Sequence, residues 1–60
     1  MGQKLVSFYN QAESIGGLKA RMRLAMISGI PSNKAESEPD SPDNISKLQN
    51  ALAEIQKEFK

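Results

Sequence analysis

The side chains of this chain that can do chemistry are mostly charged, and none of them is a histidine or a cysteine. Eight lysines and arginines stand against seven aspartates and glutamates, which gives a formal net charge of +1 at pH 7. The commonest general base and the best thiol nucleophile are therefore missing, together with the usual ligands of a zinc site. We expect a protein that is not an enzyme and that uses no metal and no cofactor.

The carboxylates lie where solvated acids are expected. Six of the seven follow residue 31, within a proline-rich stretch or on the polar side of the C-terminal segment. The stretch ESEPDSPD (36–43) offers oxygen ligands to a hard cation, but it lacks the spacing and the turn glycine of a calcium loop. The acids therefore predict no catalytic pair and no metal site.

Three basic residues, Lys19, Arg21 and Arg23, are spaced two apart in the first half of the chain. On a helix, Lys19 and Arg23 share one flank and Arg21 points to the other side. Apolar residues alternate with them, so the charges border apolar stripes, as long basic side chains do beside a helix interface. We interpret them as contacts for acidic groups of the chain or of a partner. The alternative is a nucleic-acid-binding helix that uses the same three residues.

The first half of the chain has the apolar spacing of a helix over about residues 3–28. Its apolar residues recur at alternating steps of three and four, at Leu5, Phe8, Ala12, Ile15, Leu18, Met22 and Met26. Gly29 suits the left-handed residue that follows a helix, and Pro31 prevents its continuation.

Gly16 and Gly17 interrupt this helix, and each disfavours it by about 1 kcal/mol relative to alanine. The apolar stripe nevertheless keeps its phase on both sides of the pair, which favours one continuous helix. A helix bent at the pair, or two helices that meet there, is the open alternative.

The C-terminal part predicts a second helix over about residues 42–59. Ser41 can cap it, Pro42 suits its first position, and Asp43 lies beside its positive end. A narrow apolar seam, which can pack against one partner helix, consists of Ile45, Leu48, Leu52, Ile55 and Phe59. About residues 29–41 form an acidic, proline-rich linker in which one helical turn before Pro39 is open and no group anchors a core.

These elements predict one small all-α domain over residues 1–60, arranged as an antiparallel helical hairpin. A core of this size gives only marginal stability. Because the chain has no cysteine for disulfides, association with another chain is the main remaining way to stabilise it. The single seam of the second helix covers only one side of the first. A second stripe would then be exposed and would join two hairpins into a dimeric four-helix bundle, through Val6, Tyr9, Gly16, Ala20, Leu24 and Ile27. The alternative is a monomer in which a bent first helix packs its second half against its first.

The predicted function is that of a small protein–protein interaction module that associates with itself and has a regulatory or adaptor-like role. No apolar run approaches the roughly 20 residues of a membrane span, so we expect no membrane partner. The lack of cysteine fits a reducing cytoplasm, which is the expected location.

Overall fold

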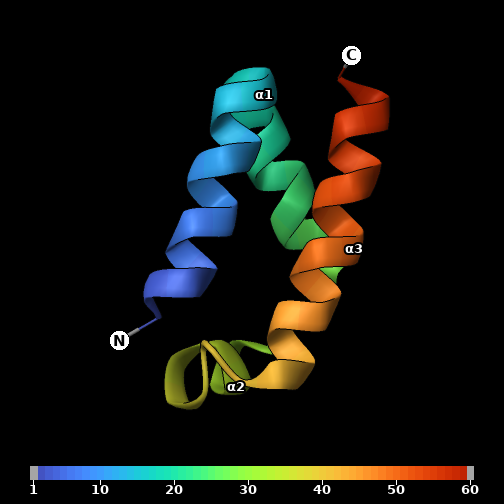
Figure 1. Ribbon diagram of the computed structural model, residues 1–60. Helices are drawn as coiled ribbons and strands as arrows, with labels where there is room; N and C mark the ends of the chain where they lie inside the picture. Colours follow the sequence, from blue (N-terminus) through green and yellow to red (C-terminus); the bar gives the residue numbers. More distant parts are fainter. Residues whose placement is uncertain (1, 60) are drawn as a thin grey trace.

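A computed structural model of the protein describes residues 2–59, which form three helices and no strand. The helix α1 spans Gln3–Ser28, α2 spans Ser32–Ser37 and α3 spans Pro42–Glu58. The predicted all-α class is confirmed, and α1 and α3 pack against each other (Figure 1). Within the described range, no helix combines the length and the apolar character needed to cross a membrane.

The helix α1 is sharply bent. A straight helix of 26 residues would be about 39 Å long, whereas the longest dimension of the described chain is 32 Å. Figure 1 shows α1 rising from the N-terminus and then descending again toward α2, with α3 rising beside it. We call residues 3–15 the first limb and residues 18–28 the second limb. The continuous helix favoured by the apolar phase is wrong, and the bent alternative describes the protein.

The two glycines at the bend have different tasks. Gly17 has a φ of 71° and a ψ of −158°, a conformation that is open essentially to glycine alone. Gly16 has a φ of −143°, which other residues adopt, but a β-carbon at this position would overlap the ring of Phe59. Gly17 therefore makes the turn, and Gly16 makes room for the last turn of α3.

The bend lets α3 cover both limbs of α1. The buried core consists of Ala12, Ala20, Leu24, Leu48, Ala51, Leu52 and Ile55. The first limb contributes Ala12 to this core and the second limb contributes Ala20 and Leu24. The predicted seam of α3 is therefore confirmed at Leu48, Leu52 and Ile55.

The second limb does not use the apolar stripe that the sequence pattern favours. Met22 and Met26, which continue the stripe of the first limb, are 67% and 72% exposed. Leu24, from the opposite stripe, is completely buried. The turn at the glycines is the reason, because it reorients the second limb after the first has placed its own stripe in the core.

The linker closes the N-terminal end of α1. The residue before this helix, Gly2, offers no side-chain cap. Asp40 accepts hydrogen bonds from the backbone N–H groups of Leu5 at 3.1 Å and Lys4 at 3.4 Å instead. A carboxylate here satisfies unpaired donors and lies at the positive end of the helix. The linker thus holds the first limb although none of its residues is fully buried, and Ile30 packs against the edge of the core.

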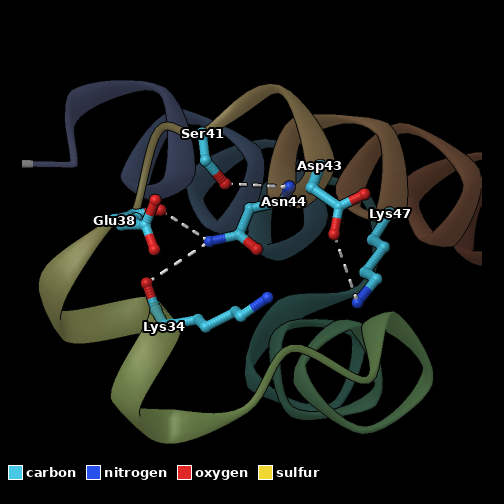
Figure 2. Close-up of polar contacts among 6 residues, drawn as sticks. All are labelled: Lys34, Glu38, Ser41, Asp43, Asn44 and Lys47. Atoms are coloured by element: carbon cyan, nitrogen blue, oxygen red, sulfur yellow. Dashed lines mark hydrogen bonds and ion pairs between the residues drawn. The ribbon is translucent and has the colours of Figure 1, made fainter.

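Asn44 fastens α2 to the start of α3 (Figure 2). It is completely buried, and its Nδ2 donates to the carbonyl oxygens of Glu38 at 2.7 Å and Lys34 at 3.4 Å. Its backbone N–H donates to Ser41 Oγ at 3.2 Å, which confirms Ser41 as the cap of α3. At the other end of the linker, Gly29 is left-handed at the end of α1, as predicted.

The separate tasks of the two glycines can be tested by a double-mutant cycle with Phe59. We expect Gly17→Ala to lower the free energy of unfolding by about 1–3 kcal/mol, because alanine is strained at this φ and ψ. Gly16→Ala should also destabilise the fold, because its methyl group meets the Phe59 ring. Urea unfolding followed by circular dichroism measures both effects.

Phe59→Ala provides the control for this cycle. In that background Gly16→Ala should cost less, because the overlap with the ring is gone and only the contact of the new methyl group with Ala20 Cβ at 2.9 Å is left. The cost of Gly17→Ala should stay the same. Equal coupling of both glycines to Phe59 would show that the two tasks are not separate.

Candidate interaction surface on the second limb

The large exposed apolar side chains gather on the second limb. Leu18, Met22 and Met26 are 67%, 67% and 72% exposed, whereas the exposed Val6 on the first limb shows 46%. Their spacing of four residues places them on one side of the helix over about 12 Å. We call these three residues the methionine face. A contiguous apolar surface of this kind is typical of an interaction site.

A groove of about 410 Å³ runs along this face. Lys19, Met22, Arg23, Met26 and Phe59 line it. The two methionines supply flexible, polarisable side chains that adapt to the shape of what they contact. Phe59 belongs to the last turn of α3, so the groove is formed where this turn meets the second limb beside the bend.

Arg23 ties the last turn of α3 to the second limb. Its Nε and Nη2 donate to the two carboxylate oxygens of Glu58 at 3.0 Å and 3.3 Å. The hydrogen bond and the charge of Glu58 raise the pKa of Arg23, which favours the protonated guanidinium of this pair. Both side chains are more than a third exposed, so the pair positions the groove wall more than it stabilises the fold.

Arg21 joins the two limbs across the bend. Its Nη1 donates to Glu13 Oε1 at 2.9 Å, and its guanidinium carbon lies 5.7 Å from the centre of the Tyr9 ring. Glu13 and Tyr9 are one turn apart on the first limb, so a single side chain of the second limb contacts both. This arrangement combines an ion pair with a cation–π contact.

Lys19 differs from the two arginines. Among residues 2–59, no carboxylate oxygen lies within 4.0 Å of its ammonium group, whereas Arg21 and Arg23 each have a carboxylate partner. The three basic residues that the sequence singles out are therefore not one surface. Two of them hold parts of the fold together, and Lys19 borders the groove.

The contact stripe predicted from the sequence needs a correction. Ala20 and Leu24 are completely buried in the core of their own chain. Tyr9, Gly16 and Ile27 are partly buried, and only Val6 of the six residues is exposed. The predicted residues therefore do not form an exposed stripe. The cause is the bend, which gives the chain's own seam on α3 access to the side of α1 that a straight helix would expose.

The sequence does carry a signal for the surface that is exposed. The second limb is apolar around most of its circumference, so α3 can hide only one of its sides. Because the chain turns at the glycines, the side of the second limb with Leu24 is hidden in the core and the side with Met22 and Met26 is exposed. Once the bend is accepted, the methionines become the apolar residues that are left for solvent or for a partner.

Comparisons with known proteins identify no relative: no family model, no characterised protein and no solved structure matches the chain significantly. The described residues also contain no group of three or more aspartate, glutamate, histidine or cysteine side chains able to hold a metal ion.

The exposure of the methionine face predicts how the protein reacts with hydrogen peroxide. Met22 and Met26 should both be converted to sulfoxides under mild treatment, because their thioethers are open to solvent. The helical content should not change, since neither side chain is part of the core. Proteolysis with mass spectrometry locates the oxidation, and circular dichroism follows the fold. Resistance of either residue would contradict the exposed face.

Proposed function

We propose that this protein is a non-enzymatic protein–protein interaction module that docks a helix of a partner protein on the methionine face. The observation that carries this proposal is the row of Leu18, Met22 and Met26, each about two-thirds exposed or more, along one side of the second limb. Leaving such side chains in water gains nothing for the fold. Covering them gains the free energy of apolar burial.

A helix is the occupant that fits the shape of this surface. The three residues form a straight row about two turns long, and the groove beside it is walled by Phe59. An amphipathic helix fills such a groove with apolar residues three or four apart. The methionines adapt to the side chains that enter, as in other methionine-rich binding surfaces.

Self-association remains a prediction of the sequence and has to use another surface than the one expected. The dimeric four-helix bundle predicted from the sequence requires Ala20 and Leu24 at its interface, but both lie in the core of their own chain. A dimer of the folded chain would instead bring two methionine faces together. The proposal includes a regulatory or adaptor-like role, which depends on the partner that binds. It also includes a cytoplasmic location.

The proposal is tested by placing a photoreactive amino acid at position 22 of the full chain in its native cells. The cross-linked protein is identified by mass spectrometry and purified, and its binding to the wild-type chain is measured by calorimetry. We expect Met22→Asp to weaken this binding at least tenfold, because docking would bury an unpaired charge.

Val6→Asp is the matched control, since it makes the same kind of change at an exposed apolar residue of the first limb. It should leave the affinity unchanged, and circular dichroism should show both variants to be helical. Equal binding to the wild type and to Met22→Asp would refute the proposal. A cross-link between two copies, with a light-scattering mass of twice the chain, would assign the face to self-association.

The nucleic-acid alternative is separated by a gel shift at two salt concentrations. Binding through phosphates would appear at low salt, weaken steeply at high salt and decrease in Lys19→Gln. We expect no shift, because Arg21 and Arg23 lie on different sides of the limb and each already contacts a carboxylate.

A further inference from the structure

The groove side of the methionine face carries a positive charge that residues 2–59 do not balance. Lys19 and Arg23 border the groove one turn apart. Glu58 uses both carboxylate oxygens on Arg23. Lys19 has no carboxylate within ion-pair distance among residues 2–59. The border therefore has one fixed, neutralised cation and one cation that can still form an ion pair.

The other side of the methionine face is basic as well. Arg21 lies there and is engaged with Glu13 and the ring of Tyr9. Among residues 2–59, the carboxylates within 4.0 Å of these three basic groups are Glu13 and Glu58 alone. Neither carboxylate is free to pair with Lys19, because each already forms an ion pair with an arginine.

This distribution disfavours a second copy as the occupant. Two antiparallel second limbs packed face to face would place the Lys19 and Arg23 flank of one copy against the same flank of the other. A parallel arrangement would place that flank against Arg21. In neither case does Lys19 meet a carboxylate of residues 2–59 that is not already paired with an arginine, so a second copy offers Lys19 no ion-pair partner.

We infer that the helix docked on the methionine face belongs to a different protein and carries an aspartate or glutamate on the flank that meets Lys19. This inference rests on the proposed function, because it names the chemistry of the partner that the same face would take. Apolar residues of the partner cover Leu18, Met22 and Met26. Its carboxylate then lies at the groove border, within reach of a long and flexible lysine side chain.

The charge preference can be tested with three synthetic amphipathic peptides of about 18 residues, a length that supports a helix in water. They share one leucine face and differ at the flanking positions, which are glutamate, glutamine or lysine. The probe is the full chain with isotope-labelled methionine methyl groups. Titration followed by NMR gives the affinity from the signals of Met22 and Met26, and circular dichroism checks that the peptides have similar helical content.

We expect the glutamate peptide to bind about two to five times more tightly than the lysine peptide at low salt, as exposed ion pairs allow. The difference should shrink at high salt because of screening. Lys19→Glu should reverse the order of the two peptides. Lys34→Glu is the matched control, because it makes the same charge change on the exposed face of α2, and it should preserve the order.

Two results would overturn the inference. If the three peptides bind equally, or if Lys34→Glu changes the order as much as Lys19→Glu does, the partner is not selected by an acidic flank. The proposed function would survive that result, because it is judged by the cross-linked partner and by Met22→Asp. If the methyl signals instead move with the concentration of the protein alone and no peptide displaces the contact, the occupant is a second copy.

Discussion

Gly17 turns the chain at a φ of 71° and a ψ of −158°, and the remaining architecture depends on this turn. Without it, α3 could pack against only one side of a long helix, and its 17 residues would be too few to cover all 26 residues of that helix. With it, two limbs and α3 surround a core small enough for 60 residues to fill. Three of the seven buried core residues are alanines, which lets the limbs approach closely where Ala12 and Ala20 face α3.

Polar contacts join the segments that surround this small core. Asp40 binds the first turn of α1 from a position 35 residues away, and Asn44 binds α2 through its amide. Arg21 joins the two limbs, and Arg23 joins the second limb to the end of α3. The contacts of Asp40 and Asn44 matter most for the linker and α2, because these segments contribute no residue to the buried core.

Local sequence signals predict those parts of the fold that local physics determines. Ser41 and Pro42 mark the start of α3, and Gly29 marks the end of α1, because caps depend on neighbouring residues. The bend could not be derived in this way. Met22 and Met26 fall in phase with Phe8 and Ile15 at about 100° per residue, so the pattern is the same for one helix and for two. The contact of Asp40 with the first turn of α1 could not be predicted either, because no local pattern links residues so far apart in the sequence.

The candidate site, too, can be predicted from the sequence only in part. That the second limb is apolar on more than one side can be seen in the sequence, and so can the basic residues beside it. Which side is hidden depends on the turn, so Leu24 and Met22 exchange the positions expected for them. The charges of Arg21 and Arg23 are balanced only after the limbs and α3 have packed, which leaves Lys19 as the distinctive cation of the groove.

The ring of Phe59 against the backbone of Gly16 couples the C-terminal turn to the middle of α1. Removal of this turn would expose Gly16 to water and take away one wall of the groove at the same time. In most small helical proteins, trimming a helix terminus only shortens a frayed end. Here it would alter the bend of α1 and the binding surface together.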